Sequence, residues 1–362
     1  MIIDDYEKVK GIDLTINPTL HQRNWTYYYQ QYITAFSCLL DVSRSCDYQT
    51  NFRYMAFLFL MRHSLELLLK NQLEQNQPGP IKSISMSHNL LQLADLAGED
   101  KIVFERDFNV LKCDSEGDCF RYLTDNNNVQ YFTGTIDSFD TCQNFILYNN
   151  LHSPGALVEI PPLDDNKSIR NELIFHSNEV RALGIITTHY DATIFELFSQ
   201  IHSNKVSAND IYLPLLFLIR HSVELKIKFA LMNIGNELSD KSVITSCHSL
   251  NKLWNVFTSH IKPAIQSITD NNFRNESLER YSQAESLKKL MADLDANSFC
   301  FRFPVDRKGN LSSFKPTKHL LEEVKDLYLK ADSFLCFAVE VLFEGGYLTI
   351  GDDIIHDTRW RN

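Results

Sequence analysis

The sequence lacks the short motifs by which many enzymes are identified. Its 362 residues contain no G-x-x-x-x-G-K-S/T phosphate loop, no G-x-G-x-x-G, no H-E-x-x-H and no G-x-S-x-G. These motifs hold a nucleotide phosphate, a dinucleotide, a catalytic zinc ion and a nucleophilic serine, respectively. The sequence therefore gives no support for a P-loop NTPase, a dinucleotide-dependent dehydrogenase, a zinc protease of that type or an α/β-hydrolase.

Paired cysteines are also missing. None of the eight cysteines forms a C-x-x-C pair, and their spacing does not match a zinc site. The first residues, MIIDDYEKVKGIDL, are acidic and lack the apolar core of a secretion signal. We therefore expect reduced thiols, a cytoplasmic location, and neither a cofactor nor a bound metal ion.

Positive charge is scarce. Lys and Arg number 35 against 46 Asp and Glu, so the net charge is −11. This balance disfavours non-specific binding to a phosphate backbone, which relies on Lys and Arg displacing counterions. RNA would need a local basic groove. The apolar runs are too short to span a membrane, so we expect no membrane association.

What the sequence does contain is a duplicated apolar stretch. Residues 54–73, YMAFLFLMRHSLELLLKNQL, share the pattern F-L-x-R-H-S-x-E-L with residues 212–232, YLPLLFLIRHSVELKIKFALM. Each copy lacks internal glycine and is apolar on nearly every side, which predicts a buried central helix. The proline of the second copy lies near its start, where a helix tolerates it.

Each predicted central helix contains an Arg, a His and a Glu among apolar residues. Helical spacing lets the Glu contact either the Arg four residues before it or the His three residues before it. Such groups can perform acid–base chemistry on a phosphate. The candidate catalytic residues are Arg62, His63, Glu66, Arg220, His221 and Glu224. Alternatively, they form a satisfied ion-pair network that fixes helix packing, and the duplication fits both interpretations.

Two further segments are repeated. S-H-N-L-L-Q-L, which contains His88, matches C-H-S-L-N-K-L, which contains His248, and each predicts the start of a helix. C-F-R-Y at 119–122 matches C-F-R-F at 300–303.

The C-F-R segments predict β-hairpins at 119–133 and 300–314, because apolar and polar residues alternate around a turn. Arg121 and Arg302 are expected to pair with the Glu of a central helix, or with the aspartates of the predicted turns. Those aspartates are Asp125 and Asp306.

The repeated order predicts a mainly α protein built from two tandem helical-bundle domains, each with a small β-hairpin. The domains are expected at 1–151 and 169–362, and the linker at 152–168 is marked by three prolines and a glycine. Two similar domains in one chain usually pack about a local two-fold axis, which predicts an intramolecular pseudo-dimer.

In these repeated motifs the chain resembles the HEPN superfamily of small helical-bundle domains. The resemblance covers most of both halves as a pattern of F-L-x-R-H-S-x-E-L, H-x-L-x-x-L and C-F-R segments. It implies domains that dimerise, that function in bacterial toxin–antitoxin, abortive-infection and anti-phage systems, and that in many cases are metal-independent ribonucleases.

The resemblance also implies a catalytic signature, an Arg followed four to six residues later by a His. Neither adjacent Arg-His pair of the central helices has this spacing, but R-N-E-L-I-F-H does. Arg170 and His176 are therefore second candidates for catalysis. They lie beside the predicted linker and have no counterpart in the first half, so two non-catalytic halves are the alternative.

Two functions are therefore expected from the sequence. The first is a HEPN-like intracellular protein of a defence or toxin system that cleaves RNA as a metal-independent endoribonuclease, alone or activated by a partner protein. The second is a non-catalytic scaffold or sensor subunit that binds a partner protein of such a system. Self-association fits both. Solvent access to the two repeated histidines distinguishes them, because a base must reach its substrate.

Overall fold

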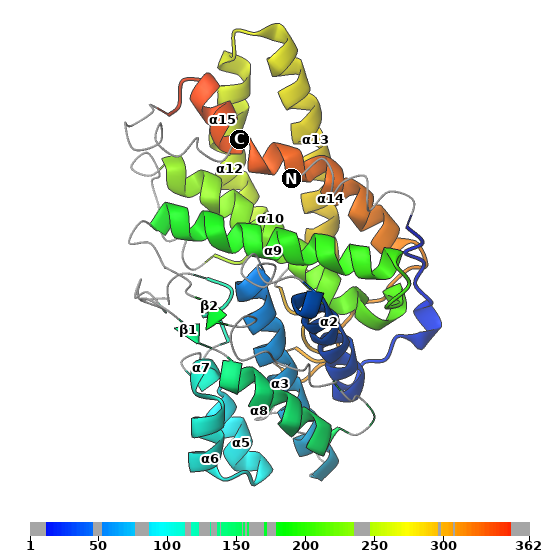
Figure 1. Cartoon of the computed structure of the whole chain (residues 1–362). Coiled ribbons are helices and arrows are strands. Elements are labelled where there is room, and N and C mark those ends of the chain that lie inside the picture. The colour runs from blue at the N-terminus through cyan, green and yellow to red at the C-terminus, as the bar shows by residue number, and fades with distance from the viewer. Residues whose placement is uncertain are drawn as a thin grey trace. The chain divides into compact units, whose positions relative to one another are not determined.

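Most of the described chain is helical (Figure 1). The computed structural model describes residues 12–45, 53–76, 87–112, 117–122, 131, 136–137, 139–153, 155, 158, 170–171, 179–234, 247–295, 298–306 and 308–348. The predicted mainly α fold class is confirmed.

The chain divides into two compact units, each built from separate stretches of sequence. The first unit comprises residues 1–222 and 298–323, and the second comprises residues 223–297 and 324–362. The division falls inside helix α10 (Ala208–Ile234) and near the start of helix α14 (Leu320–Cys336). The predicted linker at 152–168 stays a prediction.

The first unit is organised around helix α3 (Tyr54–Asn76), which packs along α2 (Trp25–Ser45). Every residue of α3 from Tyr54 to Asn71 is buried, as predicted for a helix with apolar residues on all sides. The unit also contains η1 (Pro18–Leu20), α5 (Leu90–Ala97), α6 (Lys101–Asp107), α7 (Asn109–Lys112), α8 (Phe139–His152), α9 (Glu179–His202) and the part of α10 up to Ser222.

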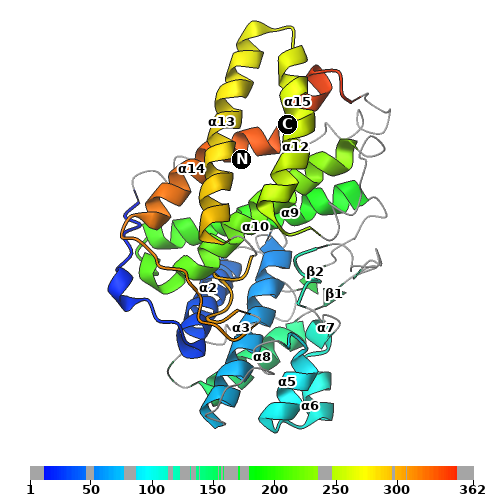
Figure 2. The same ribbon diagram turned by 180° about the vertical axis from the view of Figure 1, so that it is seen from behind.

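The second unit contains a pair of long helices, α12 (Leu250–Ser267) and α13 (Asn271–Leu294), drawn in yellow in Figures 1 and 2. Helix α15 (Ala338–Glu344) packs against α12. Ser249 caps the start of α12 by accepting a hydrogen bond from the Lys252 amide, which satisfies one of the free amides at a helix start. None of the helices in the described residues is long and apolar enough to cross a membrane.

The predicted β-hairpins are wrong within the described residues. Cys119 to Arg121 form a turn, in which the Arg121 amide bonds the Asp118 carbonyl at 2.9 Å. Residues 123–130 of the first hairpin lie outside the described part. The described residues of 300–314, all but position 307, contain a single isolated bridge between Val305 and Leu311, and no strand. A short apolar–polar alternation fits a buried turn as well as a strand, so the pattern did not distinguish them.

The strands that the structure describes lie elsewhere. Strand β1 (Ile136–Asp137) pairs antiparallel with β2 (Arg170–Asn171), and Asp137 lies opposite Arg170 in the register. The candidate Arg170 therefore belongs to a two-residue strand.

Gly345 at the end of α15 allows that helix to approach α12 closely. A Cβ atom on Gly345 would lie 2.5 Å from the backbone oxygen of Ala264 and 2.6 Å from its Cα. We expect Gly345→Ala to lower the free energy of unfolding by about 1–3 kcal/mol, because backbone atoms must move apart. Urea unfolding followed by circular dichroism measures the change. Gly155→Ala, which meets no atom within 4 Å, is the matched control; equal midpoints for the two variants would contradict the steric argument.

Candidate functional site

The carboxylate of Glu66 holds three basic side chains in the interior of the first unit. Oε2 lies 2.5 Å from Arg62 Nη1, and Oε1 lies 2.7 Å from Lys70 Nζ and 2.9 Å from His88 Nδ1. Arg62 and Lys70 each lie four residues from Glu66 on α3, so the helix itself brings them to the carboxylate. The Glu66 side chain is 1% exposed.

The pKa values follow from this arrangement. Burial alone would raise the pKa of Glu66, but Lys70, His88 and Arg62 together hold it well below its usual value. Burial lowers the pKa of Lys70, and the Glu66 charge opposes that shift. Burial likewise lowers the pKa of His88. At neutral pH, Glu66 is therefore a buried anion, and His88 is a neutral ring that donates its Nδ1 hydrogen to it.

Arg62 also ties α3 to the segments around it. Its Nη2 group donates to the carbonyl oxygen of His88, just before the start of α5. Gly117, with a φ of 79°, lies against the same guanidinium group, where a Cβ atom would be 3.3 Å from Nη1. The close approach and the left-handed backbone both favour glycine at this position.

His63 is enclosed by aromatic rings. Phe59 stacks on the imidazole at 5.4 Å between ring centroids, and Tyr32 meets it edge-on at 4.5 Å. Its Nε2 lies 3.1 Å from the carbonyl oxygen of Arg302, so Nε2 carries the hydrogen and donates it. Burial holds the pKa of His63 well below its usual value, and the ring is neutral.

His221 repeats this environment in the same unit. Phe217 stacks on its ring at 5.5 Å, and Tyr190 meets it edge-on at 4.7 Å. Its Nε2 donates to the carbonyl oxygen of Arg121 at 3.1 Å. Phe59 and Phe217 stack on each other at 4.7 Å. Each repeated histidine thus bonds the C-F-R segment that belongs to the other copy in the sequence.

A second carboxylate centre lies in the second unit. Glu224 is 3.1 Å from Lys228 Nζ and 3.0 Å from His248 Nδ1. Lys228 and His248 occupy the places that Lys70 and His88 occupy around Glu66. Neither lysine is among the residues predicted from the sequence, although the E-x-x-x-K spacing occurs in each copy of the motif.

Exposure separates two kinds of histidine. The proposed catalytic side chains of the central helices are sealed: Arg62, His63, Glu66, Arg220, His221 and Glu224 are each 0–2% exposed. His88 and His248 reach the surface, with 17% and 35% of their side chains exposed. Nδ1 of each ring lies at a buried carboxylate, 2.9 Å from Glu66 for His88 and 3.0 Å from Glu224 for His248.

The expected partners of the C-F-R arginines need correction. Arg302 does not pair with Asp306; its Nε donates to the carbonyl oxygen of Ser298 at 2.8 Å, while Asp306 accepts from the amides of Lys308 and Asn310. Arg121 donates to the carbonyl oxygen of Gly117 and pairs with Asp118 in its own turn. Arg121 is therefore paired within its own turn, and Arg302 bonds a backbone carbonyl oxygen of its own segment.

The second pair of candidates is only partly described. Arg170 has a place in strand β2, and its side chain lies outside the described part. His176 lies outside the described residues altogether. The spacing signature that names them stays a prediction.

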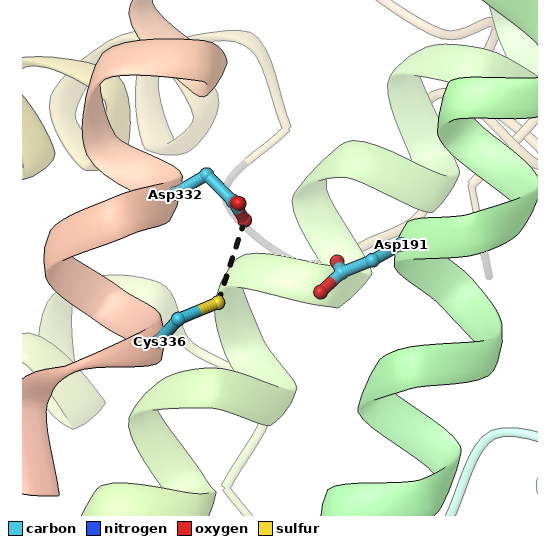
Figure 3. Close-up of side chains that lie close together, drawn as sticks. All are labelled: Asp191, Asp332 and Cys336. Atoms are coloured by element: carbon cyan, nitrogen blue, oxygen red, sulfur yellow. Dashed lines mark hydrogen bonds between the residues drawn. The ribbon is translucent and has the colours of Figure 1, made fainter. Parts of the chain in front are cut away.

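Helix α14 contributes a carboxylate and a thiol to the second unit. Figure 3 shows Asp332 and Cys336 one helical turn apart, and the Cys336 sulfur lies 3.9 Å from Asp332 Oδ1. The Lys226 ammonium group pairs with Asp332 and balances its charge. Asp191, also drawn, belongs to α9 in the first unit, where it accepts a hydrogen bond from Ser222. We interpret the Lys226–Asp332 pair as part of the interior of its unit.

Removal of the Glu66 charge tests how far the interior depends on it. We expect Glu66→Gln to lower the free energy of unfolding by about 3–5 kcal/mol, because Arg62 and Lys70 remain as buried cations with no anion. Lys70→Met in the same chain should recover part of the loss. Urea unfolding of both single variants and the double variant measures the coupling. Glu279→Gln on the exposed surface of α13 is the control; additive effects of the two substitutions would contradict the pairing.

Stability should also fall as the pH decreases below about 6.5. The unfolded chain binds protons on its histidines there, whereas burial holds the pKa of His63 well below 6.5 and lowers that of His189 to about 4 in the folded protein. Each such histidine contributes a slope of up to about 1.4 kcal/mol per pH unit. The stability that depends on these neutral histidines is fully present above pH 6.5 and is lost as the pH decreases.

His63→Gln keeps a donor near the Nε2 position but does not titrate. Between pH 6.5 and 5, the free energy of unfolding of the wild type should decrease. We expect the decrease in the variant to be smaller by about 1–2 kcal/mol. Urea unfolding at half-unit pH intervals measures this difference. Identical pH profiles for the variant and the wild type would show that His63 is not held neutral by the fold.

Comparisons with protein-family models, with curated proteins and with solved structures found no match to this chain.

Proposed function

We propose that this chain is a non-catalytic interaction protein, a scaffold or sensor subunit that binds a partner protein. The observation that carries the proposal is the sealing of the repeated Arg, His and Glu side chains, each 0–2% exposed. A general base must come within hydrogen-bonding distance of its substrate. Side chains enclosed by the protein interior hold the fold together instead.

The hydrogen bonds of the two sealed histidines support this proposal. His63 and His221 each donate their Nε2 hydrogen to a backbone carbonyl oxygen at 3.1 Å. Proton transfer at that nitrogen would break the bond that fixes a C-F-R segment. A ring held in this way is therefore suited to a structural role.

We further propose that the two copies of the repeat form an intramolecular pseudo-dimer. The exchange of C-F-R segments supports it, because His63 bonds Arg302 while His221 bonds Arg121. The stack of Phe59 on Phe217 lies between the two histidines and is consistent with a local two-fold axis there.

The HEPN-like motifs extend the proposal to a biological setting. We propose that the chain acts inside a bacterial cell as a component of a defence or toxin system, together with a partner protein. The support is the resemblance of the repeated R-H-S-x-E-L, H-x-L and C-F-R segments, combined with a mainly helical fold. The net charge of −11 is more compatible with a protein partner than with RNA.

One observation favours a second candidate function, a metal-independent endoribonuclease. His88 and His248 are partly exposed, and a buried carboxylate orients each ring through Nδ1 at 2.9 and 3.0 Å. A carboxylate-oriented imidazole is a common arrangement for a general base. If this chain cleaves RNA, these two histidines are better placed than His63 and His221.

RNA cleavage by the purified full chain in EDTA distinguishes the two functions. The proposed function predicts no fragments from tRNA or total RNA on a denaturing gel. Three variants are assayed alongside: His63→Gln/His221→Gln, His88→Ala/His248→Ala and His176→Ala.

Each pattern of cleavage has one meaning. Cleavage by the wild type that is lost only in the His88/His248 variant would replace the proposed function with the ribonuclease. Loss only in His176→Ala would place the activity at the predicted spacing signature, and loss only in the His63/His221 variant would show that the sealed centre opens. Circular dichroism confirms that each variant is folded.

A further inference from the structure

Exposed apolar side chains gather on three neighbouring helices of the first unit. Five of the ten large apolar side chains that the described residues expose lie on α5, α6 and α8, which comprise only 8, 7 and 14 residues. We call this set the α5–α8 surface. Its members are Leu96, Ile102, Val103, Leu147 and Leu151, with exposures of 47, 82, 42, 55 and 77%. The other five are scattered over different elements.

Glu99 connects the two sides of this surface. It lies three residues after Leu96 and three before Ile102, in the connection between α5 and α6. Its Oε1 accepts a hydrogen bond from Tyr148 at 2.8 Å and lies 3.8 Å from His152. Tyr148 and His152 directly follow the two exposed leucines of α8. The three helices that carry the exposed apolar side chains therefore pack together, and Figures 1 and 2 both show these helices grouped together.

The exposed side chains are additional to the core of this group. Phe104 and Phe108 are buried and contact Tyr148 at 6.1 and 5.6 Å between ring centroids, so α6 already packs against α8. Leu90 and Leu93 bury the inner face of α5. Exposed apolar residues that gather on packed helices beyond a complete core mark an interaction site more often than isolated ones do.

Charge around the surface is predominantly negative. Residues 95–107 contain five acidic and two basic side chains, a net charge of −3. Asp95 and Asp100 are exposed, and one of the two basic residues, Arg106, pairs with the adjacent Asp107 at 2.7 Å. A nucleic acid or an anionic membrane would be repelled by this rim, whereas a basic partner would be attracted.

We propose that the α5–α8 surface docks an amphipathic helix of a partner protein, with leucine-type residues on one face and Lys or Arg beside them. Apolar residues of that helix cover Leu147 and Leu151, which lie four apart on one side of α8, and its basic residues meet the acidic rim. This inference rests on the proposed function, because the basic helix is the kind of partner that an interaction protein would bind through this surface.

Fluorescence anisotropy with a labelled synthetic peptide tests the proposal. The peptide is an amphipathic Leu/Lys helix, and its controls are a scrambled peptide of the same composition and a peptide with Glu in place of Lys. We expect the full chain to bind the amphipathic basic peptide at least about tenfold more tightly than either control, because only that peptide matches both the apolar surface and the charge.

Two variants locate the binding. Leu147→Ser/Leu151→Ser should weaken binding by about tenfold or more, whereas the matched control Leu20→Ser/Leu311→Ser, also of exposed leucines, should leave it unchanged. Asp95→Asn/Asp100→Asn should weaken binding about threefold and reduce its dependence on salt. Asn at position 100 keeps a side-chain oxygen for the Ile102 and Val103 amides that Asp100 now caps.

Each other outcome overturns the inference. Equal binding of the scrambled peptide, equal loss in the control variant, or no binding by the wild type at about 100 μM peptide would remove the basic helix as occupant. Sedimentation equilibrium that shows a dimer lost on Leu147→Ser/Leu151→Ser would identify a second copy as the occupant. The proposed function is overturned by a different result, RNA cleavage by the wild type. If the chain neither cleaves RNA nor binds the peptide, this inference is wrong while the proposed interaction role stands, with the partner bound at another surface.

Discussion

The first unit depends on one buried carboxylate. A charge inside an apolar helix is tolerated only when partners replace the water it has lost. Glu66 contacts Arg62 and Lys70 of its own helix. Its third partner, His88, belongs to a later segment that packs against α3. Arg62 binds the backbone of that same segment. The position of α5 relative to α3 is therefore set by electrostatics as well as by apolar packing.

The repeated histidines have two different structural environments. His63 and His221 each bond a backbone carbonyl oxygen through Nε2 and are enclosed by aromatic rings. His88 and His248 point one nitrogen at a carboxylate and extend toward the surface. Hydrogen bonding decides which nitrogen of each ring keeps its proton, and burial decides whether that nitrogen could meet a substrate. Adjacent Arg-His residues in a sequence therefore do not by themselves indicate catalysis.

In the function proposed above, stability and recognition are assigned to separate parts of the first unit. Its charged groups near α3 are paired inside, while the apolar side chains of α5, α6 and α8 that exceed the needs of the core face outward beside acidic residues. A sealed interior and exposed apolar side chains are together consistent with the proposed role in binding.

The sequence by itself determined the helical fold class, the duplicated central helices and the groups that would lie inside them, because a helix apolar on all sides has to be buried. It also contained the E-x-x-x-K spacing that places Lys70 and Lys228 at their carboxylates. Only the tertiary structure decided that the C-F-R segments are turns, that His63 bonds Arg302 from the other copy, and that Glu66 gains His88. These contacts join residues far apart in the chain, and a short alternating pattern does not distinguish a strand from a buried turn.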